Sequence, residues 1–492
     1  MRRVGVALRP ARFARLGAAN GKNLAPSRTL HTYSAEESRT SYDSVRRFVK
    51  FSTAGNIGRV GVMILRTLRE YARSTAPASL CGATLHLEHS EDGVNKETGR
   101  VELLALGTAV PPYRFQQAHL AGWVAGSFGD DELRTWIRRL YAVSGIETRY
   151  SCLPDPNFPW QDSPFAPGRL ACETPTTAER MDIYQREATA VGSAAARAAL
   201  ADCGEGPVED VAATVTHLVV VSCTGFFAPG LDQAIARQLG LPPTVQRTLV
   251  GFMGCAAAFN GLRLAWQIVR AQPAARVLVV CVELCSLHMQ AGTNRTDLVV
   301  ASLFADGAAA CLVGAPRGDD GERLLLDTMH SALVPETRQD MVWEIGNHGF
   351  RLHLSPDIPA RLGEAAPAAL AELLDGRPMP GAWAIHPGGR AIVARLASIF
   401  DLTTQDLAPT MHVLRHYGNM SSGTILFVLR ELRQRLRAGT DLAPTGIAAM
   451  AFGPGLAVEM AHLRYIPALV PAANPTRWAR DDYHPNHSAP PP

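Results

Sequence analysis

The chain has 492 residues, of which 47% are hydrophobic and 19% are charged, so it is long and apolar enough to bury a large core. The net charge is only +3, which gives no reason to expect a nucleic-acid partner. The charge is nevertheless uneven: residues 1–75 carry 15 Lys/Arg against 4 Asp/Glu (+11), which leaves 33 basic and 41 acidic residues (−8) for the remainder.

Residues 1–95 are predicted to be a basic N-terminal extension that is partly disordered. The first 35 residues contain seven Lys/Arg and no acid, as in a transit peptide; a disordered tail or a start codon assigned too early are the alternatives. Over 57–72, apolar residues recur at helical spacing with arginines between them. This amphipathic helix would lie on a membrane surface or, alternatively, dock on the folded body.

Between about residues 100 and 466, short apolar runs typical of buried strands alternate with helical stretches. The predicted strands are Val101–Leu106, His217–Ser222, Val277–Val282, Ala309–Val313, Leu324–Thr328, Trp383–Ile385 and Ile447–Phe452. The predicted helices are Gln233–Leu239, Ala257–Ala271, Arg390–Ile399 and Gly423–Leu436. We therefore predict an α/β fold of two related halves, 98–316 and 322–468, that share one core. The tail, 469–492, is rich in proline at its end and is predicted to be disordered.

The cysteines are scattered and form no CxxC pair, which argues against both a zinc site and a secreted disulfide scaffold. They are Cys81, Cys152, Cys172, Cys203, Cys223, Cys255, Cys281, Cys285 and Cys311. Cys281, Cys285 and Cys311 lie in apolar runs and are interpreted as packing residues. No apolar run reaches about 18 residues, so no transmembrane helix is expected. We expect a cytoplasmic protein without a metal.

Three polar residues lie in turns rich in small residues. Cys255 is in Gly251–Ala258, directly before a predicted helix whose N-terminus favours negative charge. His386 is in Ala384–Gly389 and Asn419 in Tyr417–Gly423. Each alone is consistent with a structural role, as a buried thiol, a strand end or a helix cap. Together they predict acyl transfer by a resting thiolate, with His386 and Asn419 donating to an oxyanion or enolate.

These segments resemble the chalcone synthase superfamily of type III polyketide synthases over roughly residues 100–466. The resemblance is carried by Gly251–Leu264, Ala384–Gly389, His416–Ser422 and Phe452–Gly455. It implies a thiolase-like fold, two αβα halves layered as αβαβα, and a homodimer. It also implies that Cys255 accepts a starter acyl group from coenzyme A and that decarboxylated malonyl-CoA extends it repeatedly before cyclisation. Coenzyme A thioesters are then substrates and no cofactor is needed.

The resemblance also assigns pocket residues. Phe304 is the expected gatekeeper, and Leu352 a second, with Phe350 as the alternative if the alignment slips by two. Ala228 falls where plant members place a methionine in the partner's pocket. The other expected pocket residues are Thr224, His288, Trp343, Ser421, Gly453 and Pro454. Expected coenzyme A contacts are Arg149, Arg390, Gly388, Gly389 and Ala391, with Arg138 and Arg139 as further candidate cations.

The small side chains of Ala228 and Leu352 favour a long-chain fatty acyl-CoA starter, because each buried methylene contributes about 0.8 kcal/mol. The products would be alkylpyrones or alkylresorcinols, as in bacterial members, although Trp343 would shorten the cavity. One alternative is a ketoacyl-ACP synthase of fatty-acid initiation, which condenses once with a carrier-bound substrate. The other is a non-catalytic thiolase-fold scaffold recruited to membranes by its basic arm.

Overall fold

The computed structural model describes residues 99–154, 164–166, 168–290, 292–316, 321–439 and 445–468. The predicted extension, its amphipathic helix at 57–72 and the tail 469–492 lie outside these residues. No helix among the described residues is long and apolar enough to cross a membrane.

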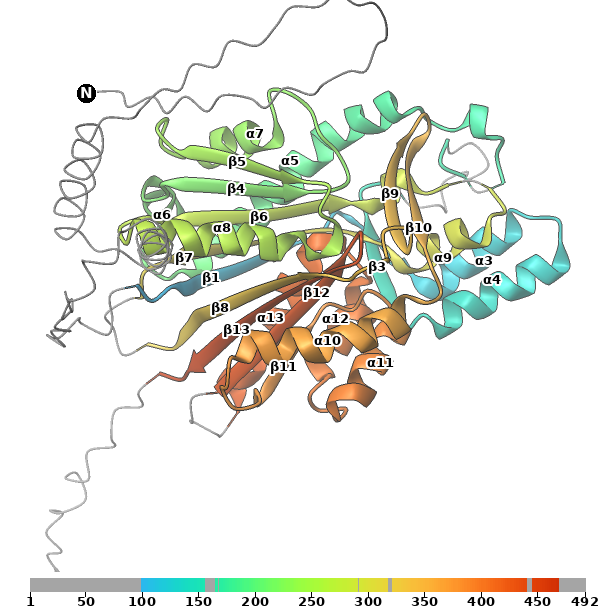
Figure 1. The fold of residues 1–492 in the computed structure, drawn as a ribbon. Helices are drawn as coiled ribbons and strands as arrows, with labels where there is room; N and C mark the ends of the chain where they lie inside the picture. Colours follow the sequence, from blue (N-terminus) through green and yellow to red (C-terminus); the bar gives the residue numbers. More distant parts are fainter. Residues whose placement is uncertain are drawn as a thin grey trace, which may run out of the picture. The chain divides into compact units, whose positions relative to one another are not determined.

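Nine of the described strands form one sheet in the order β11-β12-β13-β8-β1-β7-β6-β4-β5 (Figure 1). Their bounds are β1 Glu102–Ala109, β4 His217–Ser222, β5 Gln246–Gly251, β6 Val277–Leu284, β7 Asp306–Gly314, β8 Arg323–Leu333, β11 Ala382–Ile385, β12 Thr445–Gly453 and β13 Ala457–Ile466. Strands β1 and β8 share a single register pair, Glu102 with Leu325. The sheet therefore consists of a five-stranded part and a four-stranded part joined at one point.

The two parts repeat one order of elements. The first half runs β1, α5 (Thr177–Asp202), β4, α8 (Ala257–Ala271), β6 and β7. The second runs β8, α10 (Ile358–Leu374), β11, α13 (Thr424–Ala438), β12 and β13. In both, the inner pair is parallel (β4 with β6, β11 with β12) and the next pair is antiparallel. The halves are thus related, as the sequence predicted.

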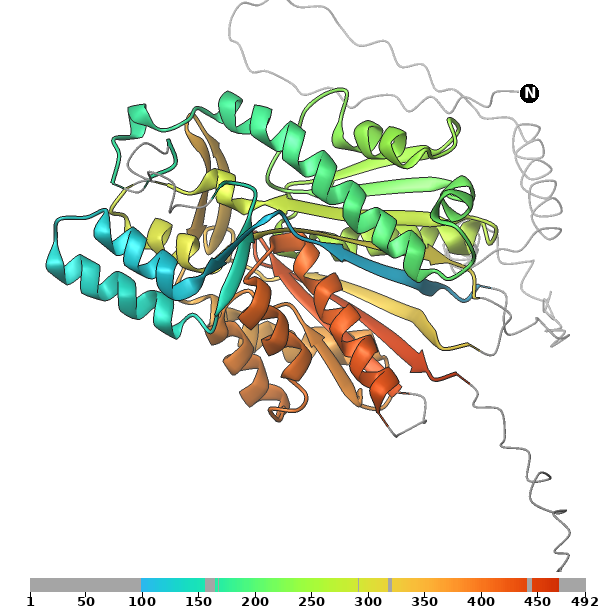
Figure 2. The same ribbon diagram turned by 180° about the vertical axis from the view of Figure 1, so that it is seen from behind.

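The strands are apolar on both faces because helices cover both. In β4, Val219 and Val221 pack with α8, whereas Leu218 and Val220 pack with α5 and α7 (Leu231–Leu239). Figure 1 shows α8 on one face of these strands, and Figure 2 shows α5 across the other.

In β12, Ala449 and Ala451 face the core shared with α8 and α13, and Ala448 and Met450 face α10. Helix α13 contacts strands of both sheet parts. The layers are therefore α5/α7, first sheet, α8/α13, second sheet and α10/α11 (α11 Arg390–Phe400), which is the predicted αβαβα arrangement.

The other described elements connect or flank these strands and helices. They are β2 Tyr113–Gln116, α3 Gln117–Gly126, α4 Asp131–Val143, β3 Thr148–Ser151, η3 Ala171–Glu173, α6 Val208–Ala213, η4 Gly254–Ala256, η5 Cys285–His288, α9 Arg295–Leu303, β9 Met341–Gly346, β10 Gly349–Leu354, α11 Arg390–Phe400, α12 Ala408–Tyr417 and η6 Ser421–Gly423. Strands β9 and β10 pair only with each other among the described strands and form a separate hairpin.

The predicted strand His217–Ser222 and helix Ala257–Ala271 are confirmed with the same bounds, and the other predicted elements are present with ends shifted by a few residues. The larger elements that the sequence did not predict are α3, α4, α5, α9, α10, α12, β5, β13 and the hairpin. Helix α5 did carry a readable signal, because Thr176 and Glu179 form a capping box at its start.

Candidate active site

Cys255 lies in the short turn η4, between the end of β5 and the start of α8. The turn has two residues with left-handed backbone, Phe252 (φ 55°) and Gly254 (φ 68°). A Cβ on Gly254 would lie 2.2 Å from Cδ of Pro454, so only glycine fits. The Pro454 loop of the second half therefore supports the cysteine turn, and such strained backbone is common at functional sites.

His386 follows β11 directly, and its backbone N–H still bonds the Met450 carbonyl of β12 at 2.8 Å. Its imidazole is buried, and neither ring nitrogen has a hydrogen-bond partner among the described residues. Burial lowers the pKa of His386 to about 3, so the ring is neutral. A buried polar group without a partner calls for an explanation, and a ligand is the natural one at the wall of a cavity.

The turn that carries Asn419 is docked on the first half of the chain. Its backbone N–H donates to the Leu303 carbonyl at 3.0 Å, and its carbonyl accepts from Ala305 N at 2.8 Å. These bonds form an isolated bridge between Phe304 and Asn419. The candidate gatekeeper of one half and the candidate donor of the other are thereby held side by side.

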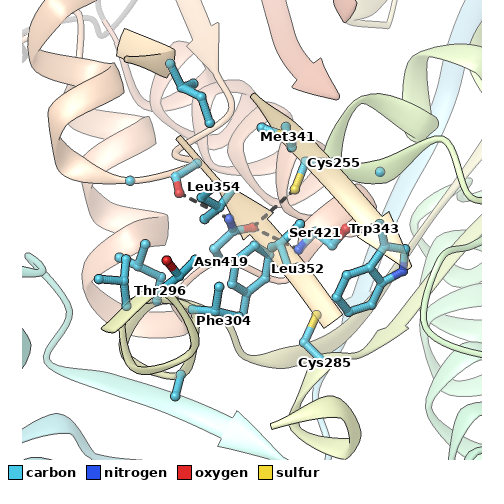
Figure 3. A pocket seen from close by; sticks show the side chains of 18 of the residues that line it. Cys255, Cys285, Thr296, Phe304, Met341, Trp343, Leu352, Leu354, Asn419 and Ser421 are labelled. Atoms are coloured by element: carbon cyan, nitrogen blue, oxygen red, sulfur yellow. Dashed lines mark hydrogen bonds between the residues drawn. The ribbon is translucent and has the colours of Figure 1, made fainter. Parts of the chain in front are cut away.

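The Asn419 carboxamide is oriented by backbone groups. Ser421 N donates to its Oδ1 at 2.9 Å, and its Nδ2 donates to the Gly388 carbonyl at 3.3 Å. Its Oδ1 lies 4.0 Å from Cys255 Sγ (Figure 3). The amide nitrogen carries two hydrogens, so a second donor is available for a ligand oxygen.

Cys255, His386 and Asn419 all line one cavity of about 420 Å³. The other sequence-predicted residues that line it are Thr224, His288, Phe304, Trp343, Leu352, Gly388, Gly389, Ala391, Ser421 and Pro454. Phe350 lines it too, since residues two apart on β10 share a face, so a slip of two does not leave the cavity. Cys285, interpreted from sequence as a packing residue, is also part of the wall (Figure 3).

The electrostatics differ from the expected resting thiolate. Burial raises the pKa of Cys255 to about 11, although hydrogen bonding with Ser421 lowers it, and the Glu283 charge raises it further. The thiol is therefore protonated at neutral pH, and His386, which lines the same cavity, is neutral. Burial outweighs the favourable position at the start of α8, because desolvation penalises the charged form of both groups.

His288 and Trp343 form a packed aromatic wall with Phe350. The His288 ring stacks on Phe350, with centroids 4.1 Å apart, and Trp343 meets both rings edge-on. Phe350 N donates to His288 Nδ1 at 3.0 Å, so Nε2 carries the hydrogen that bonds the Thr224 carbonyl at 2.6 Å. Trp343 Nε1 donates to the Cys223 carbonyl at 2.7 Å. Burial lowers the pKa of His288 to about 3, so this ring is neutral as well.

Glu283 is a buried carboxyl group that the sequence analysis missed. It accepts hydrogen bonds from Cys223 N, from Thr224 Oγ1 at 2.8 Å and from Ser422 Oγ. It thus joins the end of β4 to the Asn419 turn. Burial raises its pKa to about 7, against these hydrogen bonds. The available signal was an acid inside the otherwise apolar strand β6.

The structure contradicts the expected role of Arg149 in binding coenzyme A. Its side chain is buried, and Nη1 donates to the carbonyls of Ala301 (2.6 Å) and Phe304 (2.7 Å). The guanidinium also lies 5.5 Å from the centroid of the Tyr141 ring. These bonds hold the end of α9 behind the cavity, so the cation faces protein rather than a tunnel mouth.

The remaining predicted residues lie outside the cavity wall. Ala228 is exposed, and Gly453 supports the cysteine turn, since a Cβ there would lie 2.8 Å from the Met253 carbonyl. Arg138 and Arg139 are exposed on α4. Arg390, at the start of α11, is exposed next to the lining residue Ala391.

The family models of chalcone and stilbene synthases match the chain twice, with the N-terminal domain over residues 89–317 and the C-terminal domain over 326–467. The chain therefore belongs to the chalcone and stilbene synthase family and is a type III polyketide synthase, an acyltransferase. This membership favours iterative condensation with malonyl-CoA over the single-condensation alternative and over a non-catalytic scaffold.

Individual relatives agree with this assignment. The "Alpha-pyrone synthesis polyketide synthase-like Pks18" of Mycobacterium tuberculosis is 34% identical over 366 residues, covering 73% of this chain and 89% of that protein. The crystal structure of PKS-I from the brown alga Ectocarpus siliculosus has a TM-score of 0.68 at 29% identity and covers 76% of this chain and all of that one. The type III domain of the Dictyostelium hybrid Steely1 has a TM-score of 0.68 at 28% identity, with 75% and 99% covered. The predicted thiolase-like fold is confirmed.

Proposed function

We propose that this type III polyketide synthase loads a long-chain aliphatic acyl-CoA on Cys255, extends it with malonyl-CoA and releases alkylpyrone or alkylresorcinol products. The observation that carries the proposal is the meeting of Cys255, His386 and Asn419, from three separate turns, in one apolar cavity. No resident cofactor takes part, because both substrates arrive activated as thioesters.

In the loading step, neutral His386 accepts the thiol proton of Cys255, and the sulfur attacks the carbonyl carbon of the starter thioester. The tetrahedral oxyanion collapses, the C–S bond to coenzyme A breaks, and the proton passes to the leaving thiolate. Because the thiol has a high pKa and the imidazole a low one, this proton transfer is unfavourable in the free enzyme and is coupled to attack on the bound thioester. The Cys255 thiol is therefore a weak nucleophile until the starter thioester is bound.

In the extension step, the C–C bond to the carboxylate of malonyl-CoA breaks and CO₂ leaves. The electron pair of that bond forms an enolate. The imidazole N–H of His386 and the second amide hydrogen of Asn419 donate to the enolate oxygen. The enolate carbon then attacks the acyl carbonyl on Cys255 and displaces the sulfur, so the lengthened chain leaves on coenzyme A. Donors of this kind are each worth roughly 3–4 kcal/mol in the transition state.

The wall of the cavity supports an aliphatic starter. Much of it is aliphatic, including Val299, Leu303, Met341, Leu352 and Leu354. Each methylene buried there contributes about 0.8 kcal/mol, which favours an alkyl chain over a polar starter. The name of the mycobacterial relative, which refers to alpha-pyrone synthesis, supports a pyrone product. Ala228 gives no support within its own chain, since it is exposed.

Acyl-CoAs of 6 to 18 carbons, each incubated with malonyl-CoA and followed by mass spectrometry of the products, test this function. We expect alkylpyrone or alkylresorcinol masses and a starter acyl group on the peptide that contains Cys255. Cys255→Ala should abolish both, whereas Cys285→Ala, at a neighbouring thiol of the same cavity, should still be acylated at Cys255. Activity with malonyl-CoA alone, or only with an aromatic starter, would refute the aliphatic proposal.

We further propose that the enzyme is a cytoplasmic homodimer and that Gly388, Gly389, Ala391 and Arg390 contact coenzyme A. The first three line the cavity at the start of α11, with Arg390 exposed beside them.

Association of the N-terminal extension with anionic membranes is a separate proposal, which vesicle flotation of the full chain against a chain lacking residues 1–75 would test. Equal flotation of the two would remove it.

A further inference from the structure

The β9–β10 hairpin supplies a large share of the cavity wall without belonging to the main sheet. Five of its side chains line the cavity: Met341, Trp343, Phe350, Leu352 and Leu354. Its strands pair only with each other among the described strands, so contacts with other elements position it. Gly455 N donates to the Met341 carbonyl at 3.3 Å, and Trp343 Nε1 donates to the Cys223 carbonyl at 2.7 Å. These two bonds hold β9 on the side away from the tip, so the contacts at the tip fix the other end of the hairpin.

Thr177, the first residue of α5, holds that tip. Its backbone N–H donates to the Asn347 carbonyl at 2.8 Å. Its hydroxyl donates to the Gly346 carbonyl and accepts from Gly349 N at 2.9 Å. One threonine thus bonds the last residue of β9, the turn, and the first residue of β10.

Neighbouring residues make further contacts with the tip, and together with Thr177 they form what we call its seat at the start of α5. His348 Nδ1 lies 3.1 Å from the Thr174 carbonyl. One turn into α5, the buried Arg180 lies under Gly349, where a Cβ would be 3.0 Å from its Nη1. Gly349 also has a φ of +93°, so a side chain there is both strained and crowded. The tip therefore rests in a fitted seat at the start of α5.

The seat lies next to the residues that face the substrate. Phe350 follows Gly349 directly, and Leu352 pairs with Trp343 in the hairpin register. Phe350 and Trp343 lie one and three residues from Gly349 and Gly346 of the tip, so a shift of the tip also moves this wall.

We propose that Thr177 is a positioning residue that limits the length of the acyl starter by holding the hairpin against the cavity. The inference rests on the proposed function, because it assumes that the acyl chain occupies this cavity. Loss of the Thr177 hydroxyl releases Gly346 and Gly349, lets the wall move outward and makes room for a longer chain. Thr177 touches no substrate and acts only through the hairpin.

Thr176 is a matched control. It is the adjacent threonine and the N-cap of the same helix, but its side chain bonds Glu179 rather than the hairpin. Thr176→Ala weakens the start of α5 and leaves the three Thr177 bonds to the tip in place. A general destabilisation of α5 is thereby separated from a loss of the hairpin seat.

The experiment measures kcat/KM for hexanoyl-CoA and palmitoyl-CoA, at saturating malonyl-CoA, in wild type, Thr177→Ala, Thr177→Ser and Thr176→Ala. Since misplacing a positioned group by 1 Å can change rates about 100-fold, we expect Thr177→Ala to shift the ratio about tenfold toward palmitoyl-CoA. Thr177→Ser keeps the hydroxyl and should retain the wild-type ratio, as should Thr176→Ala. Gly349→Ala, which pushes the tip away from Arg180, should shift the ratio in the same direction. This variant replaces Thr177→Ala in the test if Thr177→Ala does not fold.

An unchanged ratio in Thr177→Ala, a shift toward hexanoyl-CoA, or an equal shift in Thr176→Ala would overturn the proposal. So would a wild-type enzyme that does not distinguish the two chain lengths. A wild type that condenses neither acyl-CoA with malonyl-CoA would instead refute the proposed function itself, so the two failures are distinct.

Discussion

At the scale of single residues, burial determines the chemistry of Cys255 and His386. The same desolvation raises the pKa of the thiol to about 11 and lowers the pKa of the imidazole to about 3. Both groups are consequently neutral in the free protein over the physiological pH range. A thiol in this state reacts slowly with electrophiles other than a substrate bound in the cavity.

Alkylation of Cys255 by iodoacetamide should therefore depend steeply on pH. Below its pKa the thiolate fraction rises about tenfold per pH unit, so the rate should climb continuously from about pH 7 to 10. Mass spectrometry of the Cys255 peptide measures the rate, and the exposed Cys172 gives an internal reference in the same sample. A rate that is already level at neutral pH would mean that Cys255 rests as a thiolate paired with protonated His386.

At the scale of elements, β1 and α5 approach each other closely enough to exclude side chains. A Cβ on Gly107 of β1 would lie 2.1 Å from Ala199 N and 2.5 Å from the Ala195 carbonyl of α5. Alanine side chains of α5 face β1, so no large side chain separates the two backbones. Helix α5 also holds the tip of the β9–β10 hairpin. The contact between β1 and α5 therefore affects the position of the cavity wall as well as the packing of the core.

Gly107→Ala should lower the free energy of unfolding by about 3 kcal/mol or more, because neither backbone can yield without disturbing the layer. The midpoint of urea unfolding, followed by circular dichroism, measures the change. Gly122→Ala in α3 is the matched control: nothing lies within 4 Å of its Cβ position, and alanine should stabilise that helix by up to about 1 kcal/mol. Equal midpoints for Gly107→Ala and wild type would contradict the close backbone contact between β1 and α5.

At the scale of the whole molecule, a partly buried ion pair joins the two halves. Arg263 of α8 bonds Glu459 of β13, which also accepts from Asn260 Nδ2 at 3.2 Å and Ser331 Oγ at 2.8 Å. Helix α8 continues from the cysteine turn, and β13 follows the Pro454 loop that supports this turn. The pair therefore helps to keep the two sides of the site in register.

Arg263→Met should destabilise the protein by about 3 kcal/mol, because it leaves the buried Glu459 carboxylate without its cation. Adding Glu459→Gln removes that charge and should restore part of the loss, seen as a higher urea midpoint in the double variant than in Arg263→Met. Arg197→Met, which breaks an exposed pair with Glu209, should cost less than about 1 kcal/mol. A double variant that is less stable than Arg263→Met would count against the role given to this pair.

Much of the fold and the core of the candidate site could be predicted from the sequence. Apolar runs such as β4 and the turns around Cys255, His386 and Asn419 are local features, and a short stretch of chain contains all that is needed to recognise them. Helix α5 was missed because its alanines give little contrast between faces. The β9–β10 hairpin was missed because Glu344 and Arg351 interrupt its apolar residues, so neither strand has the continuous apolar run of a buried strand.

The sequence by itself determined the class of chemistry, since a thiol, an imidazole and a carboxamide in small-residue turns are defined by residue type. Only the tertiary structure decided the protonation of Cys255, the inward bonds of Arg149 and the network around Glu283. Each of these depends on burial and on partners from distant segments, such as Ser422 for Glu283 and Ala301 for Arg149. Desolvation and hydrogen-bond geometry exist only after the two halves have packed together, so no local pattern reports them.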